Sequence, residues 1–325
     1  MIAMSRQPTV ILHTNAPAPA LEALRVDHGD LDIHACDDYS GLPGLIARTG
    51  AEVVYSVRFA GTPQFPRTTL VENPTVRWVS VGGSGTDHLQ PWDPGKVTVT
   101  NAAGVAANMM AEYVLGAMLS FSLDLRGFQH RQQERRWAPQ PMRPIEGRTV
   151  LVLGLGKTGQ AVAQRAKAMG MTVIGVRAQP AAVAGVDEVH GEQGLPSLWP
   201  RADFIVVCVP LLPGTKGLVG PAALASIKPG AFLVDVSRGG VVDQTALMAA
   251  LDAGRLAGAA LDVFEAEPLP PENPLWAYEN VTITPHCSSI YEGWDLKAVR
   301  MFSDNLARYR RGEPLQNVVM PQRGY

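Results

Sequence analysis

The chain has 325 residues, of which 46% are apolar and 18% charged, a composition typical of a globular protein of two domains rather than of a fibrous or disordered chain. Its formal net charge of −2 gives no attraction to polyanions, so we expect no nucleic-acid partner. Its apolar runs are shorter than the roughly 18 residues that a membrane span needs, so we expect no membrane partner.

The three cysteines, Cys36, Cys208 and Cys287, stand at spacings that suit neither a disulfide framework nor a metal site. An odd number of cysteines, in a sequence without a secretory signal at its start, predicts a reduced, cytoplasmic setting. Because neither His-Glu-x-x-His nor Cys-x-x-Cys occurs, we expect no bound metal.

Short apolar runs alternate with helical or loop segments through the first hundred residues, and this alternation predicts a parallel α/β sheet. The predicted strands are residues 9–12, 31–34, 52–56, 78–81 and 97–100. The helical or loop segments between them include residues 18–25 and 66–72.

A glycine-rich turn, Gly82-Gly83-Ser84-Gly85, directly follows the fourth predicted strand. Successive backbone N–H groups in such a turn can form a concave anion site. The same composition also suits a flexible connection, and the turn by itself does not decide between the two.

Residues 108–137 predict one long helix, because apolar side chains recur along it at helical spacing. The stripe comprises Met110, Val114, Ala117, Met118, Phe121 and Leu125. We expect it to pack within the chain or across a dimer interface rather than to bind a cofactor. The prolines at 139, 141 and 144 end this segment before the next strand.

The most informative motif follows a predicted strand at residues 150–153. It reads Gly154-Leu155-Gly156-Lys157-Thr158-Gly159 and leads into a helical segment at 160–169. Strand, Gly-x-Gly-x-x-Gly and helix together indicate a dinucleotide site. The first glycine turns tightly, the second lets a pyrophosphate approach the backbone, and the third packs helix on strand. The helix N-terminus then offers N–H groups and positive dipole to the phosphates.

Further alternation of strands and helices follows the glycine motif and predicts a second doubly wound domain over about residues 101–287. Its additional strands are predicted at residues 172–176, 204–209, 231–236, 257–263 and 281–284. Helices are predicted at residues 244–252 and 293–310.

Three ionisable residues, Arg238, Glu267 and His286, each follow one of these strands. Ligands of open α/β sheets bind beyond the carboxyl ends of the strands, so we expect all three at the edge that carries the glycine motif. A histidine can donate a proton near neutral pH, a carboxylate can hold its tautomer, and an arginine can grip a substrate carboxylate. The set fits hydride transfer from a nicotinamide to a ketone, although each residue alone also suits a structural role.

The sequence resembles the D-isomer-specific 2-hydroxyacid dehydrogenases over nearly its whole length. The matching pieces are residues 83–89, Met110-Ala111-Glu112, 154–159, Ser237-Arg238-Gly239, 262–270 and Thr284-Pro285-His286. Within that family it looks most like the glyoxylate/hydroxypyruvate reductases. That closer likeness lies in residues 258–270, Pro274-Leu275-Trp276, the region of Trp137 and Arg323-Gly324-Tyr325. The resemblance implies reduction of a small 2-oxo acid to the D-2-hydroxy acid.

The resemblance implies that His286 is the acid/base, that Glu267 is its partner, and that Arg238 binds the substrate carboxylate and carbonyl. Backbone N–H groups at Ser84 and Gly85 would hold the carboxylate from the other domain. Since these groups belong to different domains, we expect a cleft between two Rossmann-like domains that closes on the substrate and expels water.

The substrate side chain is less determined. Val57, Arg58 and Phe59 follow a predicted strand of the first domain. If Arg58 points toward the substrate, small or anionic 2-oxo acids are favoured over apolar ones.

Cofactor contacts beyond the glycine motif are also implied by the resemblance. These residues are Met110 near the nicotinamide, Val209, Pro210, Thr215, Val236, Ser237, Arg238, His286 and Ser288, with Asp262 on the carboxamide. The family's C-terminal helix returns to the first domain, so we expect a discontinuous substrate domain, residues 1–100 and 288–325, and a dinucleotide-binding domain, residues 101–287. A homodimer with the 108–137 helix at its interface is likewise expected.

One departure from the NAD pattern concerns the adenosine ribose. An NAD enzyme places an Asp or Glu about 20 residues beyond the glycines, on the ribose hydroxyls. Here the strand at 172–176 is followed by Arg177, Ala178 and Gln179. An arginine suits the 2′-phosphate of NADP(H), so we expect NADP(H) to be preferred and NAD(H) to be the weaker alternative. An ordinary surface arginine is the competing interpretation.

Two other functions stay open on sequence grounds. A formate or phosphite dehydrogenase uses the same scaffold, although formate dehydrogenases resembling this family carry Gln where Glu267 stands. A dinucleotide-sensing binding protein, like the family's transcriptional corepressors, keeps much of the same site, and a turnover assay distinguishes it from an enzyme.

Overall fold

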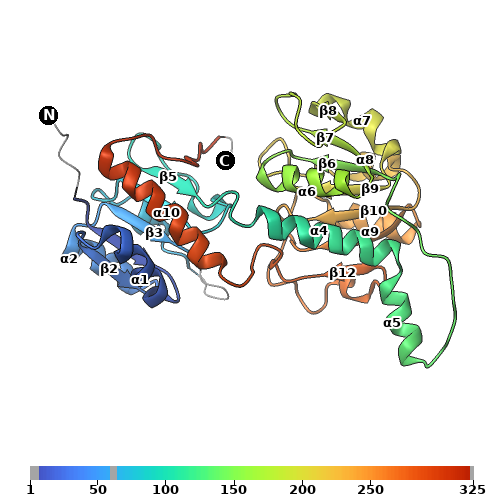
Figure 1. Cartoon of the computed structure of the whole chain (residues 1–325), viewed down its shortest axis with the longest axis horizontal. Coiled ribbons are helices and arrows are strands. Elements are labelled where there is room, and N and C mark those ends of the chain that lie inside the picture. The colour runs from blue at the N-terminus through green and yellow to red at the C-terminus, as the bar shows by residue number, and fades with distance from the viewer. Residues whose placement is uncertain (1–6, 59–63, 323–325) are drawn as a thin grey trace. The chain divides into compact units, whose positions relative to one another are not determined.

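The computed structural model describes residues 7–58 and 64–322 (Figure 1). The chain divides into two compact units: unit 1 holds Met1–Val105 and Glu292–Tyr325, and unit 2 holds Ala106–Tyr291. The predicted boundaries, at 100 and 288, lie a few residues earlier. Phe59 and Arg323-Gly324-Tyr325, which the sequence singled out, lie outside the described residues.

Local hydrogen bonds account for where the units divide. The N–H of Ala102 donates to the carbonyl of Gly83 (2.9 Å), and the Asn317 side chain donates to the carbonyl of Ala103 (3.1 Å), so the chain after residue 101 stays with unit 1. At the return, the Ser288 N–H donates to the Asp262 carboxylate (3.0 Å), which keeps that turn with unit 2.

Unit 1 contains a five-stranded sheet in the order β2-β1-β3-β4-β5, and every neighbouring pair is parallel. The strands are β1 (Val10–His13), β2 (Ile33–Cys36), β3 (Val53–Ser56), β4 (Trp78–Val81) and β5 (Thr98–Asn101). Each matches a predicted strand to within two residues. These strands are nearly continuous apolar runs because both faces of a parallel sheet are covered.

Helices cover both faces of this sheet. On one face lie α1 (Pro17–His28) and α10 (Trp294–Arg311), and the ring of Phe302 on α10 packs 5.1 Å from that of Trp78 on β4. On the other face lie α2 (Gly41–Thr49), α3 (Arg67–Val71) and η1 (Asp87–Leu89). Helices from the two ends of the chain therefore lie side by side in unit 1 (Figure 1).

Unit 2 contains a seven-stranded parallel sheet in the order β12-β11-β10-β9-β6-β7-β8. The strands are β6 (Thr149–Leu153), β7 (Thr172–Val176), β8 (Glu188–His190), β9 (Phe204–Val207), β10 (Ala231–Asp235), β11 (Leu256–Leu261) and β12 (Val281–Ile283). The strand order reverses between β6 and β9, and ligands of such sheets bind at that switch point. The three-residue β8 was not predicted, because its sequence contains no apolar run.

Helices also cover both faces of the second sheet. One face is covered by α4 (Ala107–Ser122) and α6 (Lys157–Ala168). The other carries α7 (Leu195–Leu198), α8 (Pro221–Ser226) and α9 (Gln244–Asp252), and short η2 (Glu192–Gly194), η3 (Trp199–Arg201) and η4 (Pro274–Ala277) turns complete the unit. The predicted class, two doubly wound α/β units with parallel sheets, is confirmed. Among the described residues, no helix is both long and apolar enough to span a bilayer.

The predicted single helix over residues 108–137 is wrong in detail. The chain breaks after Ser122, and α5 (Leu125–Gln133) follows as a separate helix. Asp124 causes the break: its backbone is left-handed (φ 50°), and its carboxylate accepts a hydrogen bond from the Gly127 N–H as an N-cap. Figure 1 shows α5 extending from the end of α4. None of the side chains of α5 is buried.

Candidate active site

The glycine loop lies at the switch point of the unit 2 sheet, between β6 and α6. Gly154 has φ 94°, and a Cβ there would come within 2.9 Å of the Val209 side chain after β9. A Cβ on Gly159 would lie 1.9 Å from the carbonyl oxygen of Gly154, so only glycine allows α6 to pack this close to the loop. The first and third glycines thus have the structural tasks that the motif predicts.

The second glycine, Gly156, caps the N-terminus of α6 without a side-chain hydrogen bond. A Cβ built on Gly156 meets nothing within 4 Å, so the protein itself does not require glycine here. The open space beside this backbone, next to the N–H groups of the first helical turn, fits the approach of a pyrophosphate. The residues present therefore fit a dinucleotide.

Two of the other predicted cofactor residues of unit 2, Met110 and Thr215, make defined contacts. The Thr158 hydroxyl lies 3.6 Å from the Met110 sulfur, which places α4 against the loop. After β9, the Thr215 hydroxyl donates to the carbonyl of Pro210 (2.5 Å) and accepts from the Leu212 N–H (2.8 Å), so Thr215 fixes the shape of that turn.

Arg177 stands at the carboxyl end of β7, where its backbone N–H donates to the carbonyl of His190 on β8 (3.0 Å). Its side chain is half-buried. Among the described residues, the guanidinium has no hydrogen bond or ion pair with protein. The guanidinium of Arg177 is therefore available to bind an anionic group.

The loops after β10 and β11 come into direct backbone contact. A Cβ on Gly239 would lie 1.9 Å from the carbonyl oxygen of Phe264, so glycine is required for this approach. Arg238 precedes that glycine, and its guanidinium donates to the carbonyl of Ser237 (2.8 Å). The positive charge of Arg238 acts on Glu267, which follows Phe264 by three residues.

Glu267 and His286 form a hydrogen-bonded pair: Nδ1 of His286 lies 2.8 Å from Oε2 of Glu267. The other oxygen of Glu267 accepts from the Phe264 N–H (3.0 Å). Burial opposes the charge of Glu267, but the hydrogen bonds from His286 and Phe264 outweigh it and hold the pKa of this carboxyl below its usual value. The structure therefore brings Glu267 and His286 together and places Arg238 near them.

Two buried carboxyl groups support the same edge of the sheet. Asp235, at the end of β10, accepts from the N–H (2.9 Å) and the hydroxyl (2.5 Å) of Ser237. Burial raises the pKa of Asp235 to about 7, against these two hydrogen bonds, which lower it. Asp262, at the end of β11, accepts from the N–H groups of Cys287 (2.9 Å) and Ser288 (3.0 Å). Sequence reasoning missed Asp235, and it assigned Asp262 only a contact with the cofactor.

The predicted anion turn of unit 1, Gly82-Gly83-Ser84-Gly85, directly follows β4. Within the described residues, neither the Ser84 nor the Gly85 N–H donates to another protein group. The Asn101 side chain, which sequence reasoning missed, donates to the carbonyl of Ser84 (2.7 Å) and so orients the turn. Arg58 is exposed at the end of β3. These features favour an anion site over a flexible connection.

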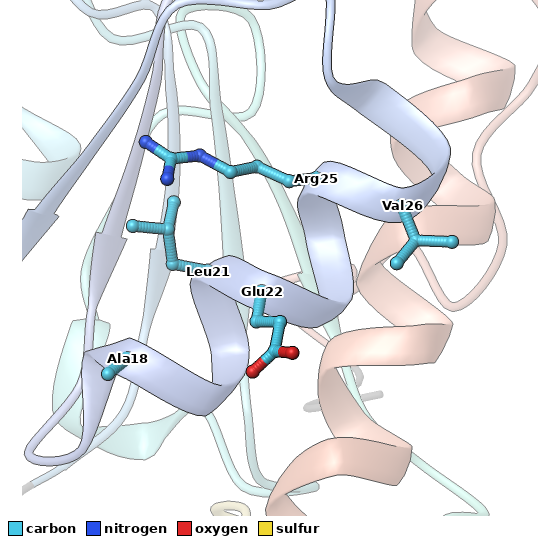
Figure 2. Close-up of a pocket in the computed structure, with 5 residues that line it drawn as sticks. All are labelled: Ala18, Leu21, Glu22, Arg25 and Val26. Atoms are coloured by element: carbon cyan, nitrogen blue, oxygen red, sulfur yellow. The ribbon is translucent and has the colours of Figure 1, made fainter.

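A surface hollow of about 510 Å³ lies elsewhere in unit 1, over the outer side of α1 (Figure 2). It is lined by Ala18, Leu21, Glu22, Arg25 and Val26, all from that one helix. Its carboxylate and guanidinium stand on the surface of one helix rather than at strand ends. The candidate site is therefore the carboxyl edge of the unit 2 sheet and not this hollow.

Known proteins are similar to this chain in sequence. The NAD binding domain of the D-isomer specific 2-hydroxyacid dehydrogenases matches residues 115–288. The D-3-phosphoglycerate dehydrogenase of Methanocaldococcus jannaschii is 37% identical over 280 residues, which are 85% of this chain and 51% of that protein, so this chain spans about half of its length. The glyoxylate reductase of Aeropyrum pernix is 30% identical over 311 residues, which are 92% of both chains.

A solved structure is also similar to this chain. The D-isomer specific 2-hydroxyacid dehydrogenase from Xanthobacter autotrophicus, in complex with NADPH and MES, is similar with a TM-score of 0.85 and 34% identity. The likeness covers 98% of this chain and 100% of that one.

We expect alanine to have different effects at Gly156 and at Gly159. Gly156→Ala should leave the melting temperature unchanged, since its Cβ meets no protein atom, but should weaken NADPH binding by at least about tenfold because the pyrophosphate loses its close approach. Gly159→Ala should instead destabilise the fold by about 3 kcal/mol or more, because its Cβ would overlap a backbone oxygen.

Gly116→Ala on α4 is the matched control, because a Cβ there also meets nothing within 4 Å, and alanine favours a helix by about 1 kcal/mol over glycine. Thermal unfolding and fluorescence titration with NADPH measure both effects. Unchanged NADPH affinity in the Gly156→Ala variant would contradict the assigned role of that glycine.

Proposed function

The chain belongs to the D-isomer-specific 2-hydroxyacid dehydrogenase family, and we propose that it reduces a small 2-oxo acid to the D-2-hydroxy acid. The observation that carries the proposal is the hydrogen bond between His286 and Glu267 (2.8 Å), formed after β12 and β11 of the sheet whose switch point holds the glycine loop. A nicotinamide cofactor, when bound, supplies the hydride.

In this proposal, His286 donates the proton to the carbonyl oxygen of the substrate. A carboxylate can only accept hydrogen bonds, so the hydrogen between the pair is assigned to Nδ1 of His286. Nε2 is then the atom that exchanges a proton with the substrate. Glu267 fixes the orientation of the ring and the tautomer that carries its hydrogen on Nδ1.

Arg238 is the proposed anchor for the substrate carboxylate and the group that polarises the carbonyl. A guanidinium offers paired donors in a plane, which match the two oxygens of a carboxylate. The N–H groups of Ser84 and Gly85 in unit 1 are proposed as a further anion site, because within the described residues they have no protein acceptor.

For the substrate we propose glyoxylate or hydroxypyruvate, or a 2-oxo acid of similar size. The full-length likeness to a protein named glyoxylate reductase supports this class. An exposed Arg58 at the end of β3 suits a polar or anionic substituent better than an apolar one. Neither a corepressor nor a phosphite dehydrogenase is favoured, since the relatives described above bear the names of 2-hydroxyacid dehydrogenases and reductases.

We further propose that NADP(H) is the preferred cofactor and that the protein works in the direction of reduction, in the cytoplasm. The support is Arg177, whose guanidinium has no partner among the described residues and stands at the strand end that carries the ribose-binding carboxylate in NAD enzymes. The 34% identical Xanthobacter structure contains NADPH, which agrees with this choice.

Removing the proposed acid tests the mechanism. His286→Ala should lower kcat by about 10²–10⁴-fold, the usual cost of losing a general acid. Arg238→Lys should also lower kcat strongly, because the ammonium group of lysine cannot make the paired hydrogen bonds of a guanidinium. Glu267→Gln should lower kcat as well, because an amide can turn either its oxygen or its NH2 group toward Nδ1 of His286 and so no longer holds one tautomer of the ring.

His34→Ala is the control, since His34 also pairs with a carboxylate, that of Asp32 (3.0 Å), but on the surface of unit 1. Steady-state kinetics from pH 5 to 9 with glyoxylate and hydroxypyruvate measure these effects. A His286→Ala protein with near-normal kcat would refute the assignment of the acid.

Reversing the charge at Arg177 tests the cofactor proposal. A charge-assisted contact with the 2′-phosphate is worth about 1.5–3 kcal/mol, or roughly one to two decades in relative kcat/KM. The wild type should therefore prefer NADPH, and Arg177→Asp should reverse the preference, chiefly by weakening NADPH.

Arg77→Asp is a control, because Arg77 is an exposed arginine at the amino end of β4, whereas Arg177 stands at the carboxyl end of β7. The measurement is kcat/KM for both cofactors at saturating 2-oxo acid. Preference of the wild type for NADH, or an unchanged ratio in Arg177→Asp, would leave Arg177 as a surface residue only.

We also propose a homodimer in which α5 and the segment after it contribute to the interface. The side chains of Leu125, Trp137 and Met142 are 44%, 97% and 52% exposed, and apolar surface gathered on one projecting segment is typical of an interaction site. Light scattering should give twice the mass of the chain at micromolar concentration, and Trp137→Asp should lower that mass. A monomeric wild type would rule out this proposal.

A further inference from the structure

A chain of hydroxyl groups joins α4 to the carboxyl edge of the unit 2 sheet. The Tyr113 hydroxyl lies 2.9 Å from the Thr284 hydroxyl, and Thr284 donates to Oδ1 of Asp262 (2.6 Å). Thr284 has one hydroxyl hydrogen, and the Asp262 carboxylate can only accept it. The remaining hydrogen bond must therefore run from Tyr113 to Thr284, so the chain has one direction: tyrosine to threonine to carboxylate.

Asp262 uses both of its oxygens to hold the backbone after His286. Oδ1 accepts the N–H of Cys287 (2.9 Å) in addition to the threonine hydroxyl, and Oδ2 accepts the N–H of Ser288 (3.0 Å). The carboxylate is buried, with 1% of its residue surface exposed. A buried carboxylate is stable only when its oxygens are hydrogen-bonded, so the donors fix its rotamer.

The backbone of His286, the proposed proton donor, is strained. His286 has φ 52°, in the left-handed region that a side chain with a Cβ disfavours. Its N–H donates to the carbonyl of Thr284 (3.0 Å), which closes the tight turn. A strained conformation of this kind persists only when its surroundings hold it, and the hydrogen bonds of Asp262 on the next two residues do so.

We propose that Tyr113 and Thr284 are positioning residues of this site: their hydroxyl chain orients Asp262, and Asp262 in turn holds the left-handed turn that aims His286. Tyr113 is suited to this task because burial raises its pKa to about 12, so its hydroxyl keeps the hydrogen that it donates. The activity part of this proposal rests on the proposed function, whereas the backbone part does not.

The proposal is tested with two variants that each remove one hydroxyl and a third variant that keeps the hydroxyl of residue 284. Thr284→Val keeps the shape but removes the donor to Asp262, and it should lower kcat by about 10- to 100-fold, as a small misplacement of a catalytic group does. Tyr113→Phe removes one hydrogen bond and should lower kcat by about five- to tenfold. Thr284→Ser restores the hydroxyl and should recover kcat to within about threefold of the wild type.

Two controls separate positioning from a general loss of structure. Tyr278→Phe removes a hydroxyl that bonds to Asp252 (2.8 Å) on the surface of the same unit, and its kcat should match that of the wild type. The KM for the 2-oxo acid should change less than kcat in Thr284→Val, because the substrate anchor Arg238 is untouched.

A readout without turnover keeps this test independent of the proposed reaction. Hydrogen exchange by mass spectrometry should show faster exchange of the Cys287 and Ser288 amides in Thr284→Val, an intermediate rate in Tyr113→Phe, and wild-type rates in Thr284→Ser and Tyr278→Phe. Unchanged exchange at these amides in Thr284→Val would overturn the positioning role, even if the wild type reduces 2-oxo acids. A wild type that reduces none of them, but shows this exchange pattern, would refute the proposed function alone.

Discussion

Direct contact between backbone segments at two glycines decides where the site in unit 2 assembles. A Cβ on Gly159 would lie 1.9 Å from the carbonyl oxygen of Gly154, and a Cβ on Gly239 would lie 1.9 Å from that of Phe264. The first contact sets α6 against the loop after β6, so the N-terminus of the helix faces the switch point. The second brings the loop of Arg238 beside the segment that leads to Glu267. Because sterics set both distances, neither arrangement needs a ligand to form.

Buried carboxyl groups fix the turns that carry the polar side chains of the site, as the close contacts at the glycines fix its loops. An unpaired carboxylate in the interior is costly, so the N–H of Ser237 converges on Asp235, and those of Cys287 and Ser288 converge on Asp262. Each carboxyl group therefore fixes a turn from which one of the proposed catalytic side chains, Arg238 or His286, projects. The strands place these residues at one edge, and the carboxyl groups set their directions.

The sequence was most informative where a physical rule acts along the chain itself. Buried parallel strands are apolar runs, the glycine motif has fixed spacing, and the topology of parallel sheets places Glu267 and His286 at one edge. The break before α5 was missed because the cap formed by Asp124 competes with an apolar stripe that continues past it. The pairing of Tyr113 with Thr284 joins residues 171 apart and follows no local pattern, so only the folded arrangement reveals it.

The left-handed backbone of His286 explains why position 262 holds an aspartate rather than an asparagine. Such a conformation costs about 1–3 kcal/mol, and it is held here by hydrogen bonds to both oxygens of one side chain. Oδ1 accepts from Thr284 and Cys287, and Oδ2 accepts from Ser288. An amide of the same shape would have to point its NH2 at one of these donors, so donor would face donor, and one N–H next to the strained residue would lose its acceptor. A carboxylate alone, with acceptors on both oxygens, holds the turn from both sides.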